Sequence, residues 1–445
     1  MGSKGLNNCG TTMADIGAAI AIISFVLTQF VDITLFYVGM IPITIQKLVA
    51  AYFLPLSAVL IGHIRLKLSL IIVATSLLVA YLAAHVVSGT LPPEALSAAA
   101  SVVFGFWGAV ILYTALTQNE RNIELLAKVW IIFSVITSIV TMLQAIGKVP
   151  LMTVPGDYLE RRIALGGLYR GVGLKFDPNF QALMLVIGLV FTQYFTRNGR
   201  LYTTVILLLG ITATFSRMGL LLGIMIVLVT PLLKIFLQRR SPGNALLHLF
   251  ADTVIISLVT IIVYMFGPQE IPEYLTQRIQ DIAVAIATIG SDHASIGGGH
   301  ITSAEARLIL AKTAWRLALE NWTFGVGAYR SDSAIFAASG IMNVAHNTYL
   351  ELFLIGGVWG IVAMLCYATI LFSGLLSDIR SLAPAFEQGF FFNLVMVFAS
   401  LCFFLSLTYN SIIWLPLVLS LTILHFEKKR RTTYPFTVTR KGCTE

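Results

Sequence analysis

Long apolar runs follow one another along most of the chain, separated by short polar stretches. About 20 apolar residues cross the hydrocarbon core of a bilayer, so the pattern predicts about twelve transmembrane helices. They lie near residues 14–31, 46–63, 68–88, 95–117, 124–147, 178–196, 201–215, 217–234, 248–267, 345–374, 388–407 and 409–426. A turn at Thr214–Arg217 separates the two shortest runs. The pattern therefore predicts an all-α polytopic membrane protein.

One long polar segment, residues 268–344, interrupts the apolar pattern before the tenth helix. We expect a long, partly helical periplasmic loop there. The predicted organisation follows the runs along the chain. It comprises five N-terminal helices in 1–147, a cationic loop with helices six to nine in 148–267, the long loop in 268–344, three C-terminal helices in 345–427 and a basic tail in 428–445.

A helix is predicted inside the long loop, from about residue 303 to residue 320. Thr302 and Glu305 before it have the spacing of a capping box. On a helical wheel Arg307 falls on the apolar side, which consists of Leu310, Ala311, Ala314, Trp315 and Ala318. A charge on a buried face is costly unless it is paired. Arg307 is therefore a candidate ligand-binding residue, with a structural ion pair as the other interpretation.

Composition and charge agree with a membrane protein. Hydrophobic residues make up 57% of the chain, charged residues 11%, and the mean hydropathy is +0.87. The net charge of +8 lies in short loops between apolar runs, a distribution that the positive-inside rule explains better than nucleic-acid binding. We predict both termini in the cytoplasm, with Arg65, Arg121 and Arg380 in inside loops.

Several cations do not fit this topological bias. The outer segment from Lys148 to Asp177 contains Arg170, and Arg217 lies at the outer turn between two short helices. An arginine at membrane depth costs roughly 2.5 to 3.5 kcal/mol on insertion scales. Guanidinium groups match phosphate oxygens bidentately. An anionic ligand, such as a diphosphate bound by Arg170, Arg217 and Arg307, would account for them.

His346 begins a long apolar helix directly after the polar loop, with Asn347, Tyr349 and Glu351 close behind it. Its ordinary pKa of about 6.5 suits a general base near neutral pH. Asn347 and Glu351 are four residues apart and share a helix face. Glu351 either orients a polar network or pairs with an arginine. An interfacial histidine bonded to a backbone carbonyl is the structural alternative for His346.

No metal site is predicted. The other histidines form no HxxH or HExxH pattern, and the outer carboxylates form no D-x-D pair. The four cysteines form no CxxC pair. We expect no cofactor.

The motifs together resemble a known family. In order they are Arg170-Gly-x-Gly, Asp177-Pro-Asn179, Thr214-Phe-Ser-Arg217, Arg307 before Gly325-Val-Gly327, and His346-Asn-x-x-Leu350 ending at Gly357. This order, over roughly residues 160–365, resembles the bacterial O-antigen ligase and O-antigen polymerase superfamily. The chain departs from the arginine, three residues, leucine pattern of the ligases, because Arg307 is followed by Leu310 and Ala311, and Arg278 by Ile282.

The resemblance implies an inverting, metal-independent membrane glycosyltransferase of the bacterial inner membrane, acting at its periplasmic face. Its donor would be a glycan on undecaprenyl diphosphate. Arg217 and Arg307 would hold the diphosphate, with Arg170 a weaker candidate, and His346 would position or deprotonate the acceptor hydroxyl. Asn347, Tyr349 and Glu351 would support it. The acceptor would be lipid A core oligosaccharide for a ligase and a lipid-linked glycan for a polymerase.

Three other functions remain open from the sequence. Ligases and polymerases share the donor chemistry, so the motifs do not separate them. A flippase or exporter of the same lipid would also need outer arginines, although the inner half of the predicted spans shows no comparable charges. A non-catalytic envelope scaffold is disfavoured by the cost of Arg217 at the membrane.

Overall fold

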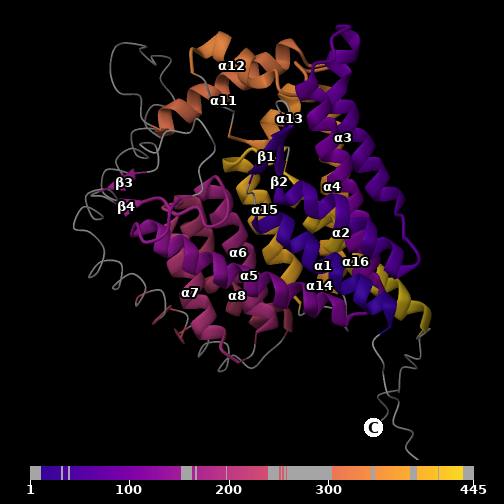
Figure 1. Ribbon diagram of the computed structural model, residues 1–445, viewed down its shortest axis with the longest axis vertical. Helices are drawn as coiled ribbons and strands as arrows, with labels where there is room; N and C mark the ends of the chain where they lie inside the picture. The colour runs from indigo at the N-terminus through magenta and orange to yellow at the C-terminus, as the bar shows by residue number, and fades with distance from the viewer. Residues whose placement is uncertain are drawn as a thin grey trace, which may run out of the picture.

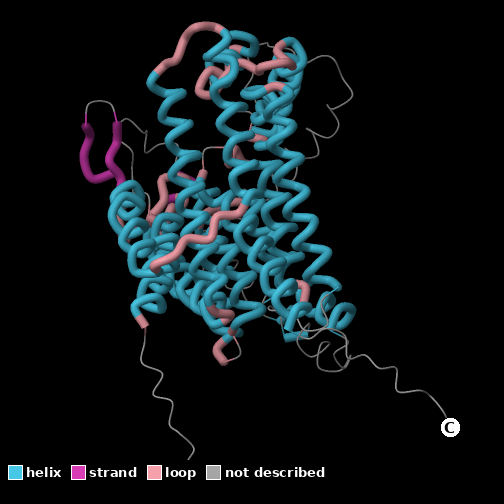
Figure 2. The backbone as a smooth tube through the Cα atoms, turned by 90° about the vertical axis from the view of Figure 1, so that its right-hand side faces the viewer, coloured by secondary structure: helices cyan, strands magenta, loops and turns pink. Residues whose placement is uncertain are grey.

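The computed structural model describes residues 12–31, 34–38, 41–151, 163–165, 168–196, 198–238, 250–251, 253–254, 257, 303–341, 346–380, 388–408 and 410–433. Within these ranges the chain is helical apart from two short antiparallel hairpins. Figures 1 and 2 show a bundle of mainly lengthwise helices, with α11 and α12 across one end. The helices are α1 Met13–Phe30, α2 Ile45–Ile61, α3 Leu68–Val87, α4 Pro93–Gln118, α5 Arg121–Ala145, α6 Pro178–Phe195, α7 Arg200–Ala213, α8 Arg217–Gln238, α11 Ser303–Glu320, α12 Ser331–Ser339, α13 Thr348–Gly356, α14 Val358–Arg380, α15 Phe390–Phe404 and α16 Trp414–Thr433. The hairpins are β1 Thr34–Val38 with β2 Ile41–Thr44, and β3 Ile163–Leu165 with β4 Leu168–Tyr169.

Eight helices in the described part of the chain are long and apolar enough to cross a membrane. Three shorter apolar helices accompany them, at Lys47–Ile61, Arg200–Ala213 and Phe390–Phe404. Of the helix expected at 248–267, the structure describes only residues 250–251, 253–254 and 257, which are helical, and the rest lies outside the described residues. The prediction of an all-α polytopic membrane protein is confirmed, and the number of spans stays a prediction.

Helix α6 forms the centre of the bundle, and almost all of its residues are buried. It packs closely against α5, where Gly188 approaches Ser134 so nearly that an added Cβ would lie 2.1 Å from the hydroxyl oxygen. Phe191 of α6 packs against Trp130 of α5 and Phe390 of α15, with ring centroids 5.7 and 5.4 Å apart. This fixed helix carries Asp177 at its N-cap and so provides a rigid base for the site.

The cationic loops gather at one end of the bundle. The backbone N–H of Arg65, between α2 and α3, donates to Thr114 Oγ1 of α4 at 2.9 Å. Arg430 at the end of α16 pairs with Glu120 between α4 and α5 at 3.0 Å. Figure 1 shows the yellow end of α16, which ends at Thr433, at the end of the bundle opposite α11 and α12. The loops expected in the cytoplasm thus share one end, while the side of the membrane that it faces stays a prediction.

The tenth apolar run is broken, and the prediction of one continuous helix over 345–374 is wrong. Helix α13 ends at Gly356 and α14 begins at Val358, because Gly357 adopts φ +57 and ψ −134. The N–H of Val358 donates to Trp322 O at 2.7 Å instead of continuing the helix. Both helices are apolar, so the hydropathy pattern continues across the break. The pair Gly356-Gly357 was the sequence feature that indicated where the helix ends.

We expect Gly357→Ala to lower the free energy of unfolding by at least about 2 kcal/mol more than Gly340→Ala does. Both glycines have positive φ, so both substitutions strain the backbone. A Cβ at Gly357 would lie 2.4 Å from Trp322 O, whereas one at Gly340 would meet nothing within 4 Å. Denaturation of the purified variants in detergent measures the difference. Equal losses would show that the contact with Trp322 tolerates a methyl group.

Candidate active site

Three segments that are far apart in the sequence bring arginines to one place. Arg170 precedes α6, Arg217 is the first residue of α8, and Arg307 lies near the start of α11. The charges of Arg217 and Arg170 lower the pKa of Arg307, after the larger effect of burial, and Asp177 raises it. These side chains are therefore within electrostatic range of one another. Three guanidinium groups facing one carboxylate favour an anionic ligand.

The loop that carries Arg170 is fastened to the neighbouring helices. Its guanidinium donates to Thr214 O through Nε and to Asn179 Oδ1 through Nη2, both at 3.4 Å. The N–H of Gly171 donates to Ala213 O at 3.0 Å. Arg170 is thereby held against the end of α7 and the start of α6, beside the turn that leads to Arg217.

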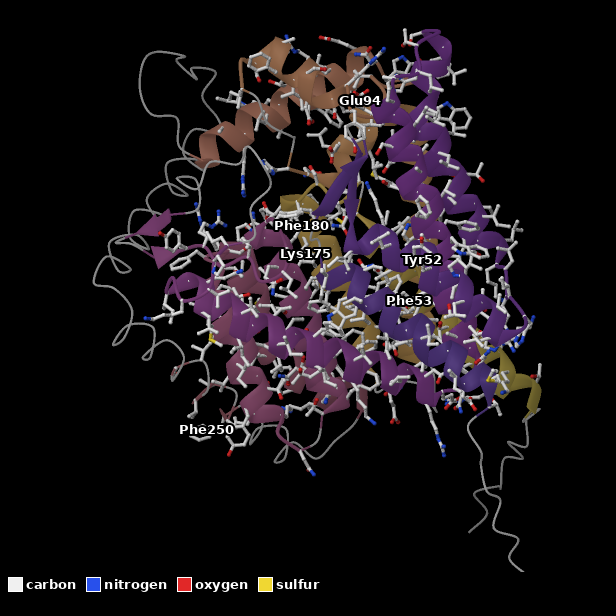
Figure 3. All side chains as sticks on the ribbon, in the orientation of Figure 1. Tyr52, Phe53, Glu94, Lys175, Phe180 and Phe250 are labelled. Atoms are coloured by element: carbon white, nitrogen blue, oxygen red, sulfur yellow. The ribbon has the colours of Figure 1, made fainter. Side chains whose placement is uncertain are left out.

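Asp177 begins α6 as the sequence predicted. Its Oδ1 accepts from the N–H groups of Asn179 and Phe180 at 2.7 and 3.3 Å, with Pro178 at the first helical position. Lys175 and Phe180, which flank Asp177 in the sequence, are labelled in Figure 3 and lie below α11 in that view. The carboxylate is the negative member of the arginine cluster.

The turn predicted at Thr214–Arg217 is present between α7 and α8. Thr214 Oγ1 accepts from Ser216 N at 3.1 Å, and Ser216 Oγ accepts from Gly219 N at 3.3 Å. Phe215 adopts φ +53, which is uncommon for a bulky residue and occurs most often at functional sites. Arg217 is exposed at the N-terminus of α8, where the helix dipole also attracts anions.

Helix α11 carries Arg307 over the site. Leu310, Ala314 and Ala318 form its buried face, packed with Leu354 of α13, and Arg307 lies at the N-terminal end of that side. The expectation that Trp315 belongs to the buried face is wrong, because its side chain is 54% exposed although its ring meets Phe353 edge-on, with centroids 5.8 Å apart. The Arg307 side chain is also exposed, so the expectation that its charge lies on a buried face is wrong.

His346 lies beside this cluster, half-buried and directly before α13. Burial and then the charge of Arg307 lower the pKa of His346, while Asp177 raises it. The lowered pKa keeps the imidazole neutral near pH 7, the form that accepts a proton. Its backbone has φ +51, so His346 and Phe215 place two strained residues around the arginines.

Residues 202–365 match the protein-family model described as O-antigen ligase. Over this stretch the chain is similar to the O-antigen ligase superfamily, as its motifs indicated. No curated protein matches the chain significantly. The matched stretch includes Arg217, Arg307 and His346, whereas Arg170 lies before it. The match supports a membrane glycosyltransferase of the O-antigen ligase or polymerase type.

The residues expected to support His346 have structural partners in the protein. The Asn347 Oδ1 accepts from Leu350 N at 3.0 Å and caps α13. The Glu351 carboxylate is buried and accepts from Thr408 Oγ1 at 2.8 Å, and the Tyr349 hydroxyl donates to Ala399 O at 3.2 Å. Their contribution to His346 would come from fixing the start of α13.

Gln144 is a site-supporting residue that the sequence analysis missed. It is buried in α5, and its Oε1 accepts from Val172 N at 2.9 Å and Gly173 N at 2.8 Å. Its Nε2 donates to Gly173 O at 2.9 Å. The amide therefore holds the loop that follows Arg170. A polar amide within an apolar span was the available clue, since such groups need partners.

In the described ranges, no three His, Cys, Asp or Glu side chains lie together in a way that would hold a metal ion.

Proposed function

We propose that this protein transfers a glycan from undecaprenyl diphosphate to an acceptor hydroxyl at the periplasmic face of a bacterial inner membrane. The observation that carries the proposal is the cluster of Arg170, Arg217 and Arg307 beside His346. It offers a site for a diphosphate next to a neutral base. Both termini would then lie in the cytoplasm.

Each group has a role in the proposed reaction. His346 accepts the proton of the acceptor hydroxyl while its oxygen forms a bond to the anomeric carbon. The bond from that carbon to the diphosphate oxygen breaks, and the electron pair leaves with undecaprenyl diphosphate. Arg217 and Arg307, with Arg170 beside them, stabilise the charge that develops on the leaving group. Attack from the face opposite the diphosphate inverts the anomeric centre.

Transfer by the purified protein in proteoliposomes tests the proposal directly. With a lipid-diphosphate glycan and a glycan acceptor, we expect a new glycosidic bond, detected by mass spectrometry. A flippase would instead move the donor across the membrane without forming that bond. Movement without transfer would therefore overturn the proposal.

The acceptor decides between a ligase and a polymerase. A ligase would use lipid A core oligosaccharide, and a polymerase the end of another lipid-linked glycan. Deletion of the gene followed by glycan analysis separates them. Accumulated lipid-linked polymer with bare lipid A core indicates a ligase, and capped single repeats indicate a polymerase.

The pH dependence of transfer provides a test of the base. Because burial and Arg307 lower the pKa of His346, we expect kcat to stay high below pH 6.5 and to fall only when the imidazole becomes protonated. Removing the cation with Arg307→Gln should raise this pKa and move the acid limb to higher pH. Profiles of kcat at saturating donor measure the shift. An acid limb that does not move would contradict the coupling of His346 to Arg307.

A further inference from the structure

A pocket of about 410 Å³ lies between the turn that joins α4 to α5 and the last turns of α16. Residues 118–121 form the wall on the turn, and Phe426, Lys429 and Arg430 form the wall on α16. The volume is within the range of about 300 to 1,000 Å³ that is typical of small-molecule sites. Figure 1 shows this end of α16 opposite α11, the helix that carries Arg307. A ligand here would be separate from the candidate active site.

The walls of this pocket carry more positive than negative charge. Arg121, Lys429 and Arg430 are cations, and Glu120 is the acidic residue among the wall residues that the structure describes. Arg430 Nη2 donates to both carboxylate oxygens of Glu120, at 3.0 and 3.1 Å, and so joins the two walls. Because the cations outnumber the carboxylate, the pocket favours an anion.

Two more cations lie near the pocket, in the loop between α2 and α3. Arg65 Nη1 donates to Thr117 O at 3.3 Å and lies 3.2 Å from His425 Nε2. Both of these partners directly precede a wall residue in the sequence. Arg65, Lys67 and Lys429 are all within electrostatic range of His425. Cations from three segments of the chain therefore add to the field at this end of α16.

One wall residue also has an unsatisfied donor. Gln118 Nε2 is buried, and it has no hydrogen-bond partner in the part of the chain that the structure describes. A buried amide N–H without an acceptor is costly. The last torsion of a glutamine side chain is soft, so the amide can turn its N–H groups toward an acceptor in the pocket. The oxygens of a phosphodiester accept hydrogen bonds, and they match both this donor and the guanidinium group of Arg121.

The pocket lies where three candidate membrane spans end. Helix α4 ends at Gln118, α5 begins at Arg121, and the apolar stretch that includes α16 runs to Arg430. The ends of apolar spans mark the boundary of the hydrocarbon core, so the pocket is at the depth of the lipid headgroups. Basic pockets between transmembrane helices at this depth bind anionic headgroups. The position thus favours a phosphate that belongs to a lipid over a soluble one.

We propose that this pocket binds the phosphodiester headgroup of an anionic phospholipid and so links the turn between α4 and α5 to α16. Arg121 and Lys429 attract the phosphate, and Gln118 donates to one of its oxygens. The inference does not rest on the proposed function, because the pocket and the arginine cluster lie at opposite ends of the bundle. Soluble phosphate is the other source of the same chemistry, and the experiment separates the two.

The test removes one pocket cation at a time and pairs each variant with a matched control. Arg121→Gln is compared with Lys128→Gln, because Lys128 is an exposed residue of α5 outside the pocket, 3.8 Å from Glu124 in an i,i+4 pair. Lys429→Gln is compared with Lys428→Gln, because Lys428 is exposed on α16 and does not line the pocket. Each control removes the same charge from the same helix.

Native mass spectrometry of the purified full-length protein measures the affinity of phosphatidylglycerol, phosphatidylcholine and inorganic phosphate. We expect Arg121→Gln and Lys429→Gln each to weaken phosphatidylglycerol binding about fivefold, as expected for one cation at the membrane surface. The controls Lys128→Gln and Lys428→Gln should change it by less than about twofold. Phosphatidylcholine has the same phosphodiester without a net charge, and it should bind the wild-type protein at least about tenfold more weakly than phosphatidylglycerol.

Gln118→Leu separates the ligand role of the amide from a structural one. Leucine removes the unsatisfied donor, so we expect phosphatidylglycerol binding to weaken about threefold or more while the denaturation midpoint of the delipidated protein does not fall. Unchanged phosphatidylglycerol binding in Gln118→Leu, Arg121→Gln and Lys429→Gln overturns the proposal. Equal losses in the control variants overturn it as well, because net charge rather than the pocket would then attract the lipid. Displacement of phosphatidylglycerol by micromolar inorganic phosphate would assign the pocket to a soluble anion and would also overturn it.

Discussion

Replacing His346 should lower kcat for glycan transfer by about 10² to 10⁴ and leave donor affinity within about twofold. The imidazole is the neutral base in the proposed reaction, whereas the diphosphate is held by the arginines. His346→Asn is the preferred variant, because asparagine tolerates the left-handed backbone found at this position (φ +51) better than alanine does. It removes the base while keeping the local fold.

Two measurements make the His346 result decisive. Single-turnover transfer reports the chemical step, and equilibrium binding of the lipid donor reports the arginine cluster. A drop in kcat with intact binding supports the role of a base. Equal transfer by His346→Asn and the wild-type protein would rule that role out, and the structural interpretation of a helix-start histidine would replace it.

Replacing Arg307 or Arg217 should have the second large effect, on donor binding. We expect Arg307→Ala and Arg217→Ala each to weaken binding of the diphosphate donor about 10- to 100-fold, as expected for a charge-assisted hydrogen bond of about 1.5 to 3 kcal/mol. Arg307→Lys should recover only part of the loss, because an ammonium group keeps the charge but cannot bind two phosphate oxygens in the same plane.

Arg316 provides the matched control on α11. It is exposed, and its Nε lies 3.9 Å from Glu320 Oε1 in an i,i+4 pair, so Arg316→Ala removes the same charge from the same helix outside the site. Donor binding should change by less than about twofold. A loss equal to that of Arg307→Ala would mean that net charge rather than the specific cluster attracts the donor, and would contradict the assignment of Arg307.

The double variant tests whether the arginines act together. The charge of Arg217 contributes to lowering the pKa of Arg307, so the two cations repel one another when no anion is bound. Removing one arginine also removes its repulsion of the other. We therefore expect the losses of donor affinity from Arg217→Ala and Arg307→Ala not to add in the double variant. Strictly additive losses would indicate that the two arginines bind independently.

Local patterns were enough to predict most of the helices. The turn before Arg217, the helix over residues 303–320 and the cap at Asp177 all follow from side chains close together in sequence, and the structure has each of them. The apolar runs marked the spans because membrane insertion depends mainly on the hydropathy of each segment. Those predictions needed no knowledge of tertiary contacts.

Contacts between distant segments decided the rest. The break at Gly357 depends on the close approach of Trp322 O, and the exposure of Trp315 depends on where α11 lies against α13. The role of Gln144 appears only when its amide meets Val172 and Gly173. None of these neighbours is adjacent in the sequence, so periodicity and spacing did not reveal them.

The sequence by itself determined that this chain is a polytopic helical membrane protein, and its motifs indicated the O-antigen ligase superfamily. It also singled out Arg170, Arg217, Arg307 and His346, because charged residues in apolar surroundings need a reason. Only the tertiary structure decided that these residues meet beside Asp177. The physical reason is that hydropathy and helix caps are local properties, whereas electrostatic coupling and cavities arise from packing between segments far apart in the chain.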